Sequence, residues 1–121
     1  MSEQLQIDLN GQTQFKPGDS INVAVAWELP DAPRWIELSL IWRTQGRGTT
    51  DRAAAFRHRW EATERPLDPA GAYVIDLVMP PGPLTYGGQL VGIGWGFRLD
   101  ADGADDVAKR PIVLTRGGNN A

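Results

Sequence analysis

The stretch from Leu90 to Asp100 constrains the fold most strongly, because large apolar residues alternate there with glycine or a polar residue. One face carries the apolar side chains of Val91, Ile93, Trp95, Phe97 and Leu99. The other face carries Gly92, Gly94, Gly96 and Arg98. A period of two predicts a β-strand with one side against a core. Glycine weakens a strand and gives it nothing to pack, so the other side is predicted to be flat.

The same alternation recurs along the chain. It predicts six further strands, in residues 5–9, 21–28, 35–44, 53–60, 73–79 and 108–115. Residues 53–60 contain three consecutive alanines that favour a helix, but the alternation of Ala54, Phe56, His58 and Trp60 favours a strand. About seven short strands with Gly and Pro turns between them predict an all-β, antiparallel two-sheet β-sandwich. The parity of these strands turns Trp27, Trp42 and Trp95 toward the core.

Length and charge exclude several classes of protein. The chain has 121 residues, 41% of them hydrophobic, which suits one globular domain. We expect residues 1–115 to form it and residues 116–121 to be a flexible tail. The net charge of −3 gives no overall attraction to nucleic acid. With no cysteine, no signal-peptide pattern and no apolar run of about 18 residues, we expect a cytoplasmic protein without disulfides or a membrane span.

The residues give little support for catalysis. His58, the one histidine, shares a face with Phe56 and Trp60, which indicates a packing role. A general base also needs an orienting partner and a nucleophile within reach. No nucleophile-elbow, zinc-protease or phosphate-loop motif is present. We therefore expect no enzyme and no cofactor; a small hydrolase remains an alternative, which requires His58 exposed beside a carboxylate and a hydroxyl.

A calcium- or carbohydrate-binding module is the other alternative. Four aspartates gather near the end of the chain, at Asp100, Asp102, Asp105 and Asp106. Carboxylates in the end loops of a β-sandwich can bind calcium, but six or more oxygens must converge. Asp102-Gly103 is also ordinary turn chemistry, with the glycine at positive φ. Only Trp35 among the tryptophans is predicted to point outward, which makes a poor platform for a sugar, so we expect neither metal nor sugar.

The flat face predicts a contact surface instead. Small residues at Ala24, Ala26, Ser39, Ala53 and Ala55 are also predicted to face outward. If their strands adjoin the glycines, one sheet has a smooth outer face that is poor in charge and can dock a protein partner or a second copy. The predicted partner-binding residues are Trp35, Ile41, Gly92, Gly94 and Gly96. The competing interpretation is that a long side chain such as Trp35 or Arg98 covers the glycines.

Three short motifs contain turn residues at fixed positions. Phe15-Lys16-Pro17-Gly18-Asp19, which stands before a predicted strand, is similar to the F/Y-x-P-G-D/E entry of arrestin-like sandwiches, and the other two motifs resemble those of uncharacterised bacterial arrestin-like proteins. The segment from Trp42 to Gly48, with Asp51, resembles a W-x-T-x-G-x-G loop, and residues 81–88 with the strand that follows resemble a P-x-x-P-x-S/T-Y-x-G segment. The resemblance implies an immunoglobulin/arrestin-like sandwich and a non-catalytic adaptor that binds proteins. This chain has room for one sandwich where an arrestin has two, and no counterpart of the arrestin charged core is visible, so phosphate sensing is not implied.

Overall fold

The computed structural model describes residues 4–46, 52–81, 86–87 and 91–115. Within these ranges the regular structure is nine strands and no helix. The strands are β1 (Leu5–Asp8), β2 (Gln14–Phe15), β3 (Ser20–Glu28), β4 (Trp35–Gly46), β5 (Arg52–Glu61), β6 (Ala70–Val78), β7 (Tyr86–Gly87), β8 (Val91–Ala101) and β9 (Ala108–Leu114). The predicted tail, residues 116–121, lies outside the described residues, as do residues 47–51, which include the end of the W-x-T-x-G-x-G motif.

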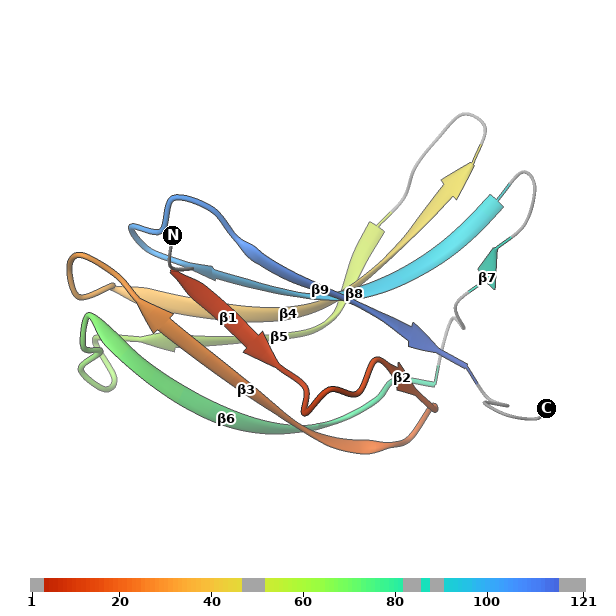
Figure 1. Ribbon diagram of the computed structural model, residues 1–121, viewed down its shortest axis with the longest axis horizontal. Coiled ribbons are helices and arrows are strands. Elements are labelled where there is room, and N and C mark those ends of the chain that lie inside the picture. Colours follow the sequence, from red (N-terminus) through yellow and green to blue (C-terminus); the bar gives the residue numbers. More distant parts are fainter. Residues whose placement is uncertain (1–3, 47–51, 82–85, 88–90, 116–121) are drawn as a thin grey trace.

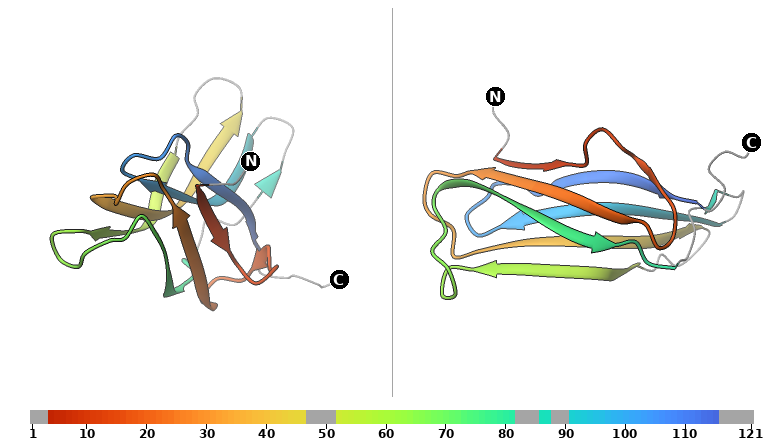
Figure 2. Two further views of the ribbon diagram at one scale, coloured as in Figure 1. Left: turned by 60° about the vertical axis from the view of Figure 1, so that its left-hand side comes forward. Right: turned by 90° about the horizontal axis from the view of Figure 1, so that it is seen from below.

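The strands form two layers, which confirms the predicted all-β sandwich (Figures 1 and 2). One sheet has three strands in the order β1-β3-β6. The other has six, in the order β2-β9-β8-β4-β5 with β7 paired to β8. All pairs are antiparallel except β2 with β9. The seven predicted strands are all present; β2 and β7 were not predicted, because two residues are too few to display a period.

The core lies between the two sheets, and the predicted parity of β8 is confirmed by Trp95, Phe97 and Leu99, which are 4%, 1% and 0% exposed. Trp27 is buried as predicted, at 5%. The expectation that Trp42 is deeply buried is wrong, since its side chain is half-buried. On β5 the neighbour of Trp42 is the small Ala53, whereas Trp95 lies between Trp42 and Ile112. At this end the paired strands β4 and β8 curve away from the three-stranded sheet (Figure 1).

Two turns connect the layers. Asn10 and Gly11 both have positive φ, and the Gln12 amide donates to the carbonyl of Leu9 at 3.1 Å, as in a type I′ turn. This turn leads the chain out of the three-stranded sheet toward β2 in the other. Before β3, Pro17 and Gly18 occupy the two centre positions of a second turn, in which Gly18 has φ +85°.

A β-bulge in β5 corrects the predicted parity of that strand. Leu40 lies opposite Phe56, but the next residue of β4, Ile41, lies opposite Ala54, so Ala55 is extra. The bulge moves Ala54 to the outer face with Ile41 and places Ala53 on the same side as Trp42. The predictions that Ala54 faces the core and that Ala53 faces outward are therefore wrong. Alternation cannot reveal a bulge within a run of three alanines.

Candidate functional site

The predicted flat face lies on the outside of the six-stranded sheet, at the end where β4 and β8 curve. Gly96 sits between Ile41 of β4 and Pro111 of β9, and these three residues form a row across the sheet. Two residues further along β4, toward its C-terminal end, Arg43 lies opposite Gly94. The row is apolar, and its centre does not project from the sheet, because Gly96 of the central strand has no side chain.

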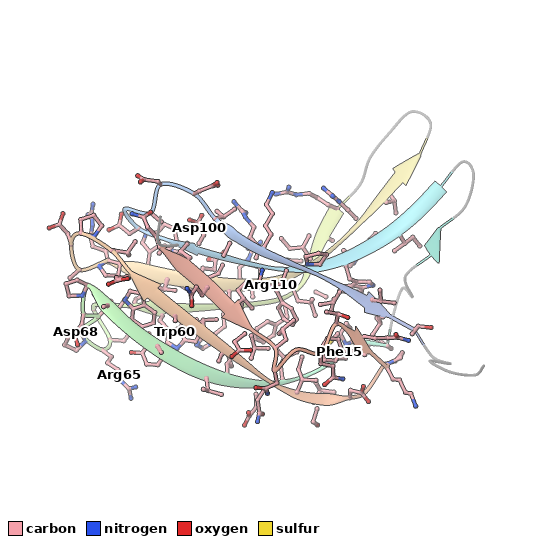
Figure 3. All side chains as sticks on the ribbon, viewed as in Figure 1. Phe15, Trp60, Arg65, Asp68, Asp100 and Arg110 are labelled. Carbon is pink, nitrogen blue, oxygen red and sulfur yellow. The ribbon has the colours of Figure 1, made fainter. Side chains whose placement is uncertain are left out.

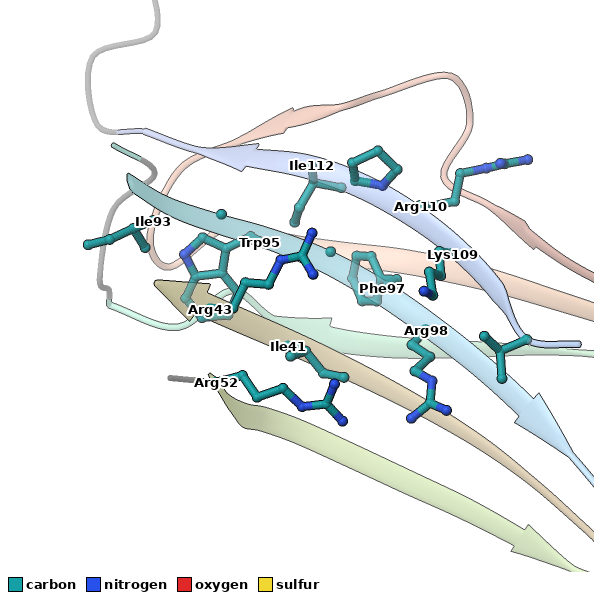
Figure 4. Close-up of a pocket in the computed structure, with 14 residues that line it drawn as sticks. Ile41, Arg43, Arg52, Ile93, Trp95, Phe97, Arg98, Lys109, Arg110 and Ile112 are labelled. Atoms are coloured by element: carbon teal, nitrogen blue, oxygen red, sulfur yellow. The ribbon is translucent and has the colours of Figure 1, made fainter. Parts of the chain in front are cut away.

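A groove of about 720 Å³ opens over this row (Figure 4). We call it the outer groove; its floor is Ile41, Gly94, Gly96 and Pro111, and its rim is Arg43, Arg52, Arg98 and Lys109. The two described glycines serve differently. A Cβ on Gly96 would lie 3.3 Å from the carbonyl oxygen of Arg110, so this glycine allows the close approach of β9. A Cβ on Gly94 would meet nothing within 4 Å, so this glycine leaves the groove open.

The outer groove is basic, which overturns the expectation of a face poor in charge. Arg43 of β4 lies directly opposite Arg52 of β5. Lys109 lies opposite Arg98 across β8 and β9. No aspartate or glutamate is among the described residues that line the groove. A face poor in charge required the small residues of β3 to adjoin the glycines, but Ala24 and Ala26 belong to the opposite sheet.

On the other half of the same outer face, the arginines pair with a carboxylate of the same sheet. Glu37 pairs with Arg57 at 3.5 Å and with Arg59 at 3.0 Å, and the Arg59 guanidinium lies 4.4 Å from the centroid of the Trp35 ring. Ser39 is only 5% exposed there, because Arg57 and Arg98 flank it on the neighbouring strands. This half is thus already covered by its own long side chains.

The predicted partner-binding residues therefore do not all meet. Ile41, Gly94 and Gly96 come together in the outer groove. Trp35 lies opposite Glu61 at the far end of β4, eight positions from Arg43 and so about 26 Å away along the strand. It does not cover Gly94. Gly92 pairs through its backbone position with Gln45 and Gly87, one step beyond the groove. Sequence reasoning missed Arg43, Arg52 and Lys109, since only strand register brings them together.

His58 has a packing environment. Its ring meets the edge of Trp60 at 4.5 Å between centroids, on the inner side of β5 opposite Leu38. Within the part of the chain that the structure describes, neither a carboxylate nor a hydroxyl is in hydrogen-bonding contact with His58. The arrangement required for a small hydrolase is not formed around this histidine.

The aspartates near the end of β8 shape a turn. Asp102 accepts a hydrogen bond from the Arg34 amide at 3.1 Å and pairs with the Arg34 guanidinium at 3.4 Å. Asp106 caps the amide of Val107 at 2.8 Å, and Gly103 has the predicted positive φ of +84°. Among described residues no three His, Cys, Asp or Glu side chains gather as metal ligands would.

Comparison with known proteins supports the fold. No family model matches the chain, and neither does any curated protein. Among solved structures the fold is similar to that of Spo0M, the sporulation control protein of Bacillus subtilis, with a TM-score of 0.61 at 16% identity. The likeness covers 92% of this chain and 48% of that chain, so this chain spans about half the length of Spo0M. It supports an arrestin-like β-sandwich. The described part of the chain contains no helix that is long and apolar enough to cross a membrane.

Proposed function

We propose that this protein is a non-catalytic β-sandwich module that binds a protein partner through the outer groove. The observation that carries the proposal is the open space over Gly94, where an added Cβ would meet no atom within 4 Å. The groove lies on an exposed sheet face between side chains from β4, β5, β8 and β9. A concave surface of this kind on a rigid sheet is suited to receiving part of another molecule.

Two further observations support a binding role over a catalytic one. The one histidine packs against Trp60, and the aspartates near β8 hold backbone amides or Arg34. The structural neighbour Spo0M is named for control of sporulation, which describes regulation rather than a reaction. We include in the proposal membership of the bacterial arrestin-like proteins and a cytoplasmic location, on the grounds of the turn motifs and the absence of cysteine.

The test compares two substitutions that introduce the same side chain on opposite sheets. Gly94→Trp fills the outer groove, whereas Val74→Trp enlarges an exposed side chain on β6 of the three-stranded sheet, where Val74 is 67% exposed. The parent and both variants serve as bait in a lysate of the native host, and the captured proteins are quantified by mass spectrometry. Sedimentation of the pure protein at high concentration tests self-association in parallel.

We expect proteins that the parent and Val74→Trp capture equally and that Gly94→Trp loses. Dissociation of a self-associated parent by Gly94→Trp would identify the partner as a second copy. Capture that survives Gly94→Trp, in a variant with the circular dichroism of the parent, would contradict a binding role for the groove.

A further inference from the structure

Three cations of the outer groove, Arg43, Arg52 and Lys109, form no ion pair with a described residue, whereas the fourth, Arg98, pairs with Asp100 at 3.9 Å. We propose that the groove binds an extended acidic peptide segment of the partner, with carboxylates pairing to Arg43, Arg52 and Lys109. This inference rests on the proposed function and adds the chemistry of the partner.

The charge arrangement favours an anion. Arg43 and Arg52 face each other directly on neighbouring strands, and like charges in that position are destabilising. Neither forms an ion pair with a described residue, nor does Lys109. Elsewhere on the same face, Glu37 pairs with Arg57 and Arg59 of β5, and Asp100 pairs with Arg98. Arg43, Arg52 and Lys109 therefore lack the carboxylate that this face supplies to its other arginines, although the whole chain carries a net charge of −3.

The floor has the dimensions of one extended chain. Ile41, Gly96 and Pro111 lie on three adjacent strands, so the outer two are about 10 Å apart, with only glycine between them. Along β8, Gly94 and Arg98 are four residues apart, or about 13 Å. A strand of about four residues fits this length. Its backbone can approach the glycines while its side chains reach the cations on either side.

The side chains and the shape of the groove argue against nucleic acid and a membrane as the ligand. Single-stranded nucleic acid is bound by exposed aromatic rings on which bases stack. In the groove the aromatic residues Trp95 and Phe97 point to the core and are 4% and 1% exposed. A flat bilayer cannot follow the hollow of the outer groove (Figure 4). An acidic peptide requires neither stacking nor a flat surface.

The test is a binding titration followed by fluorescence anisotropy. The probe is a labelled octaglutamate peptide; octaglutamine serves as the uncharged probe, and an oligo-dT of eight nucleotides as the nucleic acid. The variants are Arg43→Glu and Arg52→Glu, each of which changes the net charge by the same amount as the control Arg65→Glu. Arg65 lies in the loop between β5 and β6, at the end of the molecule far from the groove (Figure 3). Circular dichroism and melting of each variant check the fold.

We expect the parent to bind octaglutamate and not octaglutamine, with an affinity that falls as salt rises. Arg43→Glu and Arg52→Glu each weaken binding about tenfold, as for loss of one close charge pair, and Arg65→Glu weakens it less than about twofold. No binding of octaglutamate, or equal weakening by all three variants, overturns the inference. Tighter binding of oligo-dT with the same dependence on Arg43 and Arg52 also overturns it, in favour of nucleic acid.

The two proposals fail separately. Gly94→Trp adds bulk without charge and tests the groove as a site in the lysate experiment. If that variant loses the captured partners while Arg43→Glu and Arg52→Glu retain them, the groove binds proteins but not through these arginines. If Gly94→Trp retains the captured partners while octaglutamate binding depends on the arginines, the anion site is real and the protein-binding role is not.

Discussion

Trp60 and Tyr73 stack across the two sheets, with ring centroids 5.2 Å apart and ring planes 13° apart. Trp60 belongs to β5 and Tyr73 to β6, the edge strands of the two sheets. His58 packs edge-on against Trp60, and the ring centroids of Trp27 and Tyr73 lie 5.3 Å apart, so four rings run from one sheet to the other. At the opposite edge the contact is polar, since the Arg110 guanidinium donates to the carbonyl of Ile7 at 3.2 Å.

We predict that the stacked pair stabilises the sandwich beyond the area it buries. Trp60→Ala, Tyr73→Ala and the double variant form a thermodynamic cycle, measured by denaturant unfolding. The expected coupling energy is about 0.5–1.5 kcal/mol, the range for an aromatic pair. A cycle of Trp60→Ala with Val74→Ala, whose side chain points away from the stack, should show none. A coupling near zero for Trp60 and Tyr73 would show that the rings merely fill space.

Glycine is required at position 71 and free to change at position 94. Gly71 lies opposite Trp27, and a Cβ there would come within 2.7 Å of the indole carbon Cζ2. The indole cannot easily shift, because it is buried and its Nε1 donates to the carbonyl of Asp68 at 2.8 Å. We expect Gly71→Ala to lower the free energy of unfolding by about 1–3 kcal/mol.

Gly94→Ala is the matched control, since its Cβ meets open space. It should raise the free energy of unfolding by about 0.5 kcal/mol, because alanine loses less backbone entropy than glycine in a strand. Urea unfolding of both variants measures the two changes in the free energy of unfolding. Equal effects of the two substitutions would contradict the close contact at Trp27.

Trp95 and Trp42 face each other on β8 and β4 but differ in burial. Trp95 is 4% exposed, so Trp95→Ala should cost about 3–5 kcal/mol of stability, as for the loss of a large buried aromatic side chain. Trp42→Ala should cost clearly less, because Trp42 is half-buried where the sheet curves away. Calorimetric melting of both variants provides the comparison. A Trp95→Ala protein that melts within a couple of degrees of the parent would refute the assignment of Trp95 to the core.

The arginine pair of the outer groove should reduce the stability of the free protein. Arg43 and Arg52 face each other with like charge, so Arg52→Glu replaces repulsion by attraction. We expect this variant to be more stable than the parent by about 0.2–1 kcal/mol at low salt, with the gain shrinking as salt screens both exposed side chains. Urea unfolding at two salt concentrations measures the effect. A loss of stability at low salt would mean that Arg52 has a structural partner.

Calcium should leave the protein unchanged. Asp102 is engaged with Arg34, and Asp106 with the amide of Val107. Neither arrangement brings together the six or more oxygens that calcium takes. We expect the same melting temperature with millimolar calcium and with a chelator. A calcium-dependent rise that Asp102→Asn abolishes would instead restore the calcium-binding alternative.

Local patterns predicted the strands and most of their faces. A strand turns its side chains alternately whatever its neighbours are, so the burial of Trp95, Phe97 and Leu99 follows from spacing alone. The turns at Gly11 and Gly103 were predictable for the same reason, since positive φ is a property of one residue and its neighbours. The sequence by itself thus determined an all-β sandwich and the side of each regular strand that enters the core.

The tertiary structure alone decided which outward residues meet. Ala24 faces outward on the other sheet and does not adjoin the glycines, while Trp35 lies at the far end of β4. Arg43 and Arg52 come from consecutive strands and Lys109 from the last strand, and only the pairing of β4 with both β5 and β8, and of β8 with β9, assembles them around the outer groove. Strand order and register depend on contacts between distant segments, and a bulge at Ala55 shifts a face by one residue. A period of two records which side a residue is on, but not which residues lie beside it.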